Sequence, residues 1–271
     1  MEKFISYLVG LYCYIFGSIK LLKNWPGYLI DLIRFFLKKN NTVSEFIFRD
    51  GTIISIHPKA RSLNFVFYDV FLRRDYDSLP QFKIKEEDTI IDIGAHLGFF
   101  TISAAKQARR GKVFAFEPFS KHFEILKKNI EQNNFNNVHI FQEAISNKTL
   151  DVNFYYTMEN DPSDTSLFII SQGKQVFSEI VREVQFDEIF MRENIETCDF
   201  LKLDCEGAEY EILMGLSDEN LMKIKKIAME WHRFAPEHDT SKLISFLKDK
   251  GFKLIIPSDL NRKYGLLYAY K

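Results

Sequence analysis

The sequence has few of the features that would tie it to nucleic acid, zinc or a disulfide framework. Its 36 basic and 37 acidic side chains give a net charge of −1, whereas nucleic-acid-binding proteins carry a clear excess of Lys and Arg on one face. The three cysteines, Cys13, Cys198 and Cys205, form no CxxC pair and have no histidine at the spacing of a zinc site. We therefore expect no nucleic-acid partner and a reduced, cytosolic compartment.

The amino terminus has no apolar run that clearly spans a membrane. Residues 4–19 are 16 uncharged residues, short of the ~20 needed to cross a bilayer core. Residues 1–39 hold nine aromatics and six basic against two acidic side chains, a net charge of +4 that leaves −5 for the rest. Two interpretations stay open: a helical segment packed on the main domain or on a second subunit, or an interfacial anchor on anionic headgroups. The second would hold the protein at the inner face of the membrane.

The pattern divides the chain into three parts. Residues 1–43 form an apolar, basic segment in which a second helix is expected over 28–39, with Asp31 on its polar face. Residues 44–87 are a β-containing lead-in that begins with a hairpin around Asp50-Gly51, a favoured tight-turn pair. The main domain follows over 88–271.

From residue 88 onward, short apolar runs alternate with amphipathic segments, which is typical of βαβ units and a parallel sheet. About seven strands are expected, of which the last two lie close enough in sequence to form an antiparallel pair at one edge. The interval 145–198 is longer than a crossover requires, and we interpret it as an insertion near the ligand-binding edge. The predicted fold is therefore α/β with a mostly parallel sheet, preceded by a helical and β-hairpin extension.

A glycine turn follows the first strand of this domain. Gly94 and Gly98 let the backbone turn tightly and leave room for a ligand at the carboxyl end of the strand. Asp92 is placed to receive the ammonium of a cofactor, directly or through water, and His96, inside the turn, to contact its carboxylate. The third glycine of a GxGxxG motif is absent, which weakens a dinucleotide interpretation.

Two acids follow the next strands in order. Glu117 ends the second strand, where a carboxylate can accept hydrogen bonds from both hydroxyls of an adenosine ribose. Glu143 follows the third strand, where it could face an adenine edge. Three such residues at successive strand ends favour S-adenosylmethionine as the cofactor; a nicotinamide-dependent oxidoreductase is the alternative.

A second set of polar residues follows the fourth and fifth strands. Asp204 and Glu206 come after one strand, and Glu230 and His232 end the next. In an open parallel sheet these ends share one crevice with the glycine turn, so the four side chains should converge. Without partners, buried acids are costly, which favours a functional role.

These motifs together carry a family resemblance. The order IIDIGAHLGFFT, FAFEP, FLKLDCEGAEYEIL and MEWH over about residues 88–256 resembles the FkbM family of S-adenosylmethionine-dependent methyltransferases. The resemblance implies a class I (Rossmann-like) methyltransferase with a seven-stranded sheet, acting mostly as an O-methyltransferase on sugar or polyketide oxygens. It carries over Asp92, Gly94, Gly98 and Glu117 as cofactor residues and Asp204, Glu206 and Glu209 as the acidic motif after strand four.

Methyl transfer to a sugar or glycan hydroxyl calls for a general base. We expect this base to be His232, oriented by Glu230 or Asp204, because a neutral imidazole titrates in the useful range. Glu206 and Ser166, the latter in the polar loop of the insertion, are the expected substrate contacts. The alternatives are that Asp204, Glu206, Glu230 and His232 bind a metal ion such as Mg²⁺, or that the chain is a non-catalytic cofactor-binding module. We interpret the remaining histidines, His57, His122, His139 and His238, as structural.

Overall fold

The structure is a computed structural model of the 271-residue chain. It describes residues 12, 14–37, 39–57, 63–157, 165–166 and 176–271.

A seven-stranded sheet forms the centre of the molecule. Its strand order is β12-β13-β11-β10-β3-β4-β5, and every neighbouring pair is parallel except the two that β13 makes. The strands are β3 (Thr89–Ile93), β4 (Lys112–Phe116), β5 (Val138–Phe141), β10 (Phe200–Leu203), β11 (Lys226–His232), β12 (Lys253–Ile255) and β13 (Tyr264–Tyr270). The class I architecture and the antiparallel final pair are thus confirmed, with β13 lying between β11 and the edge strand β12.

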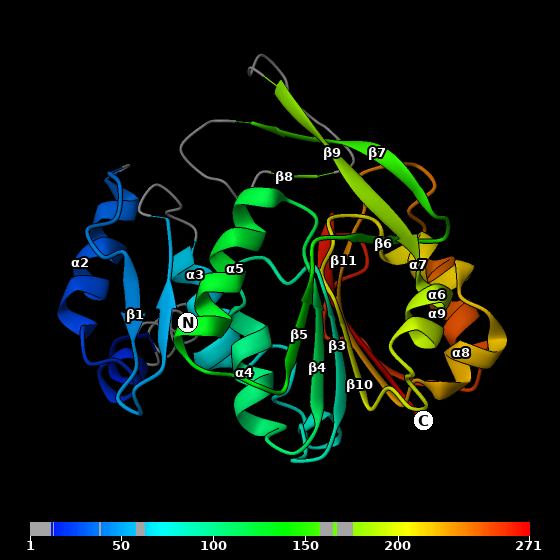
Figure 1. Cartoon of the computed structure of the whole chain (residues 1–271), viewed down its shortest axis with the longest axis horizontal. Helices are drawn as coiled ribbons and strands as arrows, with labels where there is room; N and C mark the ends of the chain where they lie inside the picture. Colours follow the sequence, from blue (N-terminus) through cyan, green and yellow to red (C-terminus); the bar gives the residue numbers. More distant parts are fainter. Residues whose placement is uncertain (1–11, 13, 38, 58–62, 158–164, 167–175) are drawn as a thin grey trace.

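Helices cover both faces of this sheet, because the strands are apolar on both sides (Figure 1). One face packs against α4 and α5, and the other against α6 to α9. The bounds are α4 (Phe99–Gln107), α5 (Ser120–Gln132), α6 (Phe186–Arg192), α7 (Glu209–Gly215), α8 (Asp218–Lys223) and α9 (Thr240–Asp249).

The predicted insertion contains a second sheet of four strands, in the order β6-β9-β7-β8. It lies over the upper end of the main sheet in Figure 1, the end that carries the site described below. Its strands are β6 (Ala144–Ser146), β7 (Leu150–Thr157), β8 (Thr165–Ser166) and β9 (Val176–Gln185).

The lead-in contains the expected hairpin and three short helical elements. β1 (Glu45–Ile47) and β2 (Ile53–Ser55) pair antiparallel, and the loop between them includes Gly51 at a φ of 96°. After the hairpin the lead-in contains α3 (Leu63–Phe67) and η1 (Tyr68–Arg73), followed by η2 (Pro80–Phe82).

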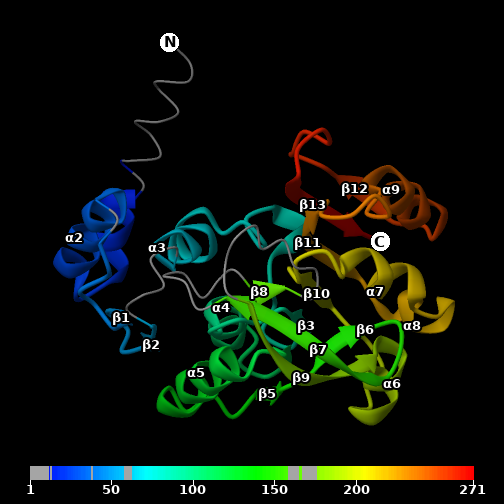
Figure 2. The same ribbon diagram turned by 90° about the horizontal axis from the view of Figure 1, so that it is seen from above.

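The amino-terminal segment packs on the lead-in. Residues 14–21 are helical, and α2 covers Trp25–Phe36, earlier than the expected 28–39 because Pro26 lies in the first turn, where a missing N–H costs nothing. The hydroxyls of Tyr14 and Tyr28 both donate to the carbonyl of Asn64. Figure 2 shows these helices beside α3.

Asp31 differs from the sequence expectation. It does not lie on an exposed polar face; it is fully buried, and its carboxylate accepts hydrogen bonds from Thr42 N and Oγ1 and from Val43 N at 2.6 to 2.8 Å. The acid therefore anchors the chain that follows α2. Within the described residues, no helix combines the length and apolarity needed to cross a bilayer.

Candidate active site

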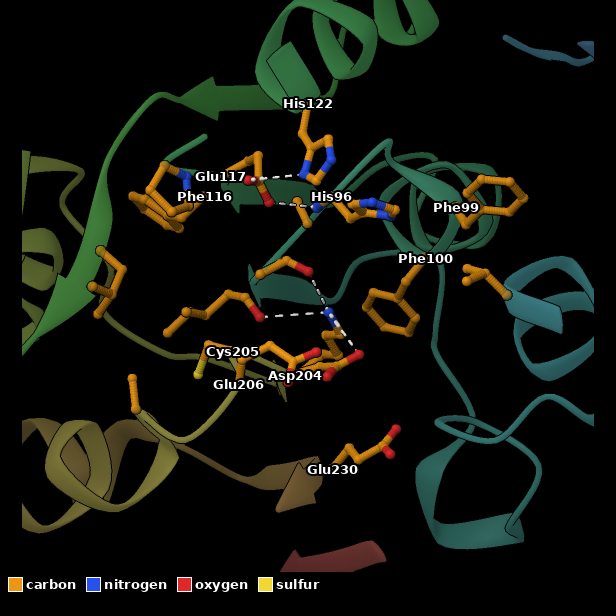
Figure 3. Close-up of a pocket in the computed structure, with 18 of the residues that line it drawn as sticks. His96, Phe99, Phe100, Phe116, Glu117, His122, Asp204, Cys205, Glu206 and Glu230 are labelled. Atoms are coloured by element: carbon orange, nitrogen blue, oxygen red, sulfur yellow. Dashed lines mark hydrogen bonds and ion pairs between the residues drawn. The ribbon is translucent and has the colours of Figure 1, made fainter. Parts of the chain in front are cut away.

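A cavity of about 240 Å³ lies at the carboxyl ends of β3, β4, β10 and β11. Figure 3 shows Glu117 and His96 on one side of it and Asp204 and Glu230 on the other. Seven of the predicted site residues line it: Gly94, His96, Glu117, Glu143, Asp204, Glu206 and Glu230. Asp92, Gly98 and His232 are outside the lining.

The glycine turn is closed around its neighbouring strand. Gly94 has a φ of 78°, and a Cβ there would lie 1.9 Å from the carbonyl oxygen of Asp204. The amides of Gly94 and Ala95 both donate to the carbonyl of Phe116 at 3.0 Å. Only glycine fits this close approach, so Gly94 lets the turn pack tightly against the end of β10.

Glu117 is held against the turn from the next strand. Its carboxylate accepts hydrogen bonds from the amides of His96, at 2.8 Å, and Phe119, at 3.0 Å. His122 approaches the same carboxylate at 3.6 Å and packs edge-on against the His96 ring. Burial, with the charges of His122 and Lys202, lowers the pKa of His96, so this imidazole is neutral. His122, which the sequence suggested was structural, lines the cavity.

Glu143 is fixed by a cation from α6. Arg192 donates two hydrogen bonds to its carboxylate, at 2.9 and 2.8 Å, and the guanidinium lies over the ring of Phe141. A bidentate pair of this kind orients a carboxylate firmly. The negative charge of Glu143 is thus balanced at the cavity wall, and its contact with an adenine stays a prediction.

Asp92 lies beneath the turn and not in the cavity. It is fully buried, accepts a hydrogen bond from Thr101 at 2.6 Å, and has the ammonium of Lys202 at 3.1 Å. Lys202 also donates to the carbonyl of Gly94 at 2.7 Å. Burial lowers the pKa of Lys202, but the charges of Asp92 and Asp204 outweigh it and raise the pKa overall. The contact of Asp92 with a cofactor ammonium stays a prediction; here its charge is met by Lys202.

Asp204 receives a hydrogen bond from the lead-in. The Tyr76 hydroxyl donates to Asp204 Oδ2 at 2.8 Å, and Lys202 Nζ lies 3.9 Å from the same oxygen and over the Tyr76 ring. Tyr76 is buried, and burial and the charge of Asp204 raise the pKa of its hydroxyl. Tyr76 is therefore a hydrogen-bond donor that fixes Asp204.

Glu230 lies on the same side of the cavity as Asp204 (Figure 3). Burial, followed by the charge of Asp204, raises the pKa of Glu230 to about 8, although the charge of His232 acts in the opposite direction. A carboxyl group with a raised pKa accepts a proton near neutral pH far better than an ordinary glutamate.

His232 lies behind this wall. Its Nδ1 is 3.0 Å from Glu209, while Nε2 is 3.8 Å from both Glu206 and Glu230. Burial works to lower the pKa of His232, but the hydrogen bond and charge of Glu209, with the charges of Asp204 and Glu206, raise it to about 10. These neighbours favour an imidazolium, whereas the sequence argument needed a neutral ring oriented by Glu230 or Asp204. The orienting carboxylate is instead Glu209, which also accepts from the amides of Cys205 and Gly207.

The predicted substrate contacts have different outcomes. Glu206 lines the cavity with its side chain 41% exposed. Ser166 lies in β8, opposite Tyr155 of β7, but its side chain is outside the described part of the chain. For the metal alternative, the described residues contain no group of three or more His, Cys, Asp or Glu side chains arranged to hold an ion.

Lys202 and Tyr76 are among the site residues that sequence reasoning missed. Lys202 interrupts the apolar strand FLKL, and a lysine inside a strand buried on both faces is a signal that could have revealed it. Tyr76 lies 128 residues from its partner Asp204, and no sequence pattern connects the two.

The sequence matches one family model and several known methyltransferases. The profile of the methyltransferase FkbM domain matches residues 92–254. Methyltransferase 1 of Beauveria bassiana is 26% identical over 79% of this chain and 91% of its own. The 31-O-demethyl-FK506 methyltransferase FkbM of Streptomyces tacrolimicus is 22% identical over 75% of this chain and 86% of its own. The hexuronic acid methyltransferase AglP of Haloferax volcanii is 24% identical over 60% of this chain and 64% of its own.

Proposed function

The chain belongs to the FkbM family of S-adenosylmethionine-dependent methyltransferases, and on that premise we propose that it methylates a hydroxyl oxygen of a sugar or glycan. The observation that supports this most directly is the cavity itself. It joins a glycine turn and Glu117 on one side to the carboxylates of Asp204 and Glu230 on the other. Carboxylates suit a sugar because its hydroxyls are hydrogen-bond donors.

The residues of the first side fit the cofactor. Gly94 packs the turn against Asp204 and lines the cavity together with His96 and Glu143, and Glu117 offers carboxylate oxygens to ribose hydroxyls. The contact of Asp92 with the cofactor's ammonium, directly or through water, stays a prediction, because its carboxylate is buried beside Lys202. When bound, S-adenosylmethionine supplies a methyl group on a sulfonium for in-line displacement.

The residues of the second side activate the acceptor. We assign the general base to Glu230, whose carboxylate would take the proton of the acceptor hydroxyl. The hydroxyl oxygen would then accept the methyl group that bound S-adenosylmethionine would supply, with S-adenosylhomocysteine as the leaving group. Asp204, held by Tyr76, orients the same hydroxyl or its neighbour, and Glu206 contacts the acceptor. His232 acts through Glu230 as a nearby positive charge rather than as the base.

The direct test uses S-adenosylmethionine with a labelled methyl group. We expect the purified enzyme to transfer label to extracted glycolipid or polysaccharide fractions, and mass analysis to place it on a sugar oxygen. Excess S-adenosylhomocysteine should suppress the transfer. Label found on nitrogen, carbon or a non-sugar oxygen would contradict the proposal.

We also propose that the amino-terminal helices contact an anionic membrane surface. Five apolar side chains there are more than half exposed: Tyr12, Phe16, Ile30, Ile33 and Leu37. Lys20, Lys23 and Lys39 are exposed nearby in sequence, while Asp31 is buried. An apolar, basic surface without an exposed acid between residues 14 and 39 suits an interface of anionic lipid.

Vesicle flotation tests this surface. The full-length protein should float with vesicles containing phosphatidylglycerol and much less with pure phosphatidylcholine. Combining Phe16→Ser and Ile33→Ser should weaken binding at least about tenfold, because each side chain contributes roughly 1.5–3 kcal/mol when buried. Met222→Ser, at an exposed position of α8, is the control. If the Phe16→Ser, Ile33→Ser double variant floated as well as the wild type, the membrane contact would be refuted.

A further inference from the structure

Part of the cavity wall comes from outside the region that matches the family. Val66, Asp69, Val70, Asp75 and Tyr76 line the cavity, and all precede residue 92, where the match begins. They belong to α3, η1 and the turn after η1. The acceptor side is therefore built jointly by the methyltransferase domain and the lead-in.

Acidic side chains predominate on this side of the cavity. It holds five carboxylates, those of Asp69, Asp75, Asp204, Glu206 and Glu230. Among the described residues that line the cavity, Lys202 is the only lysine or arginine. Its ammonium is already committed to Asp92 at 3.1 Å and to the carbonyl of Gly94 at 2.7 Å, so it offers little to a negatively charged acceptor.

Asp69 is the lead-in residue that extends this field. Arg73 is shared between Asp69, at 3.3 Å, and Asp75, at 3.0 Å, so one cation serves two carboxylates. Burial and the charge of Asp75 raise the pKa of Asp69 to about 6, Arg73 lowers it, and the charge of Asp204 also raises it. The carboxylates of the lead-in and of the methyltransferase domain thus act on one another across the cavity.

We propose that Asp69 is a specificity-determining residue that restricts the acceptor to uncharged or amino sugars and excludes sugars that carry a carboxylate. The argument rests on the proposed sugar methylation and adds the charge of the acceptor to it. A uronate placed among these acids meets like charges, while the neighbouring cations Lys202, Arg73 and His232 already pair with carboxylates of the protein, and such a juxtaposition of like charges is unfavourable. Hydroxyls and an ammonium, in contrast, donate hydrogen bonds to these acids. By its name, the hexuronic acid methyltransferase that this chain resembles acts on a sugar that carries a carboxylate, the class that we propose this chain excludes.

Three matched probes test the selectivity: methyl glucoside, methyl glucosaminide and methyl glucuronide, each offered to the full-length wild-type enzyme with labelled S-adenosylmethionine. We expect transfer to the glucuronide to be at least about tenfold slower than to the glucoside. Asp69→Asn should raise the ratio of glucuronide to glucoside transfer severalfold. Asp249→Asn, at an exposed position of α9 far along the chain, should leave the ratio unchanged.

The outcomes separate the two proposals. If the wild type methylates the glucuronide as fast as the glucoside, sugar methylation stands and the charge selectivity is wrong. If none of the three is methylated while S-adenosylhomocysteine binds, the sugar activity fails and the selectivity with it. A poorly folded Asp69→Asn variant would show a weakened affinity for S-adenosylhomocysteine. In that case the rates of the wild type on the glucoside and the glucuronide still decide whether the enzyme selects acceptors by charge.

Discussion

Replacing Lys202 with methionine should lower the free energy of unfolding by about 3–5 kcal/mol, measured by urea denaturation. The ammonium of Lys202 and the carboxylate of Asp92 are 3.1 Å apart, with side chains 4% and 0% exposed. Methionine fills a similar volume but leaves Asp92 as a buried charge whose one remaining hydrogen bond from the described residues comes from the hydroxyl of Thr101. Breaking one side of a buried pair is costly because the remaining charge can reach neither water nor a counterion.

A second substitution distinguishes this cause from poor packing. Lys202→Met combined with Asp92→Asn removes both charges, and most of the lost stability should return. Lys225→Met is the matched control, because Lys225 is 59% exposed and pairs with Asp199 at the surface, where such pairs contribute about 0–1 kcal/mol. If Lys202→Met lowered the free energy of unfolding by less than about 1 kcal/mol, the Lys202–Asp92 pair would not be required for stability.

Much of the fold could be predicted from the sequence, because hydrophobic period and strand-end chemistry are local. The apolar runs around Ile91, Phe114 and Leu201 indicated parallel strands buried on both faces, and they are buried. Parallel strands present their carboxyl ends at one edge, so Gly94, Glu117 and Asp204 could be brought to one cavity without any structure.

What the sequence could not provide depends on tertiary packing. Tyr76 and Asp69 lie in an aromatic stretch without a clear period, and their place beside the cavity follows only from how α3 and η1 pack on α4 and the sheet. The position of His232 shows a different limit. Its strand was foreseen, but its charge depends on Glu209, which approaches from the first turn of α7.

Glu230→Gln should lower kcat by about 10² to 10⁴-fold, the usual contribution of a general base, with little change in the affinity for S-adenosylhomocysteine. Glutamine keeps the shape of the side chain but cannot accept the acceptor's proton. In the wild type the base must be deprotonated, and burial with the charge of Asp204 raises the pKa of Glu230 to about 8. The rate should therefore rise with pH through the neutral range and level off above that value, and the variant should lack this rise.

His232→Gln separates the two candidate bases. The positive charge of His232 lowers the pKa of Glu230, so removing it should raise that pKa and shift the rate profile to higher pH, with activity recovered under alkaline conditions. If His232 were itself the base, the variant would stay slow at every pH and Glu230→Gln would retain a profile set by the imidazole. The rate of methyl transfer is measured at saturating cofactor between pH 6 and 10, and calorimetry measures the affinity of both variants for S-adenosylhomocysteine. These measurements distinguish a pH–rate profile that has moved to higher pH from one that has disappeared. Because Glu209 rather than Glu230 holds the imidazole in place, the substitution should leave the carboxylate of Glu230 in the cavity and change mainly its charge environment.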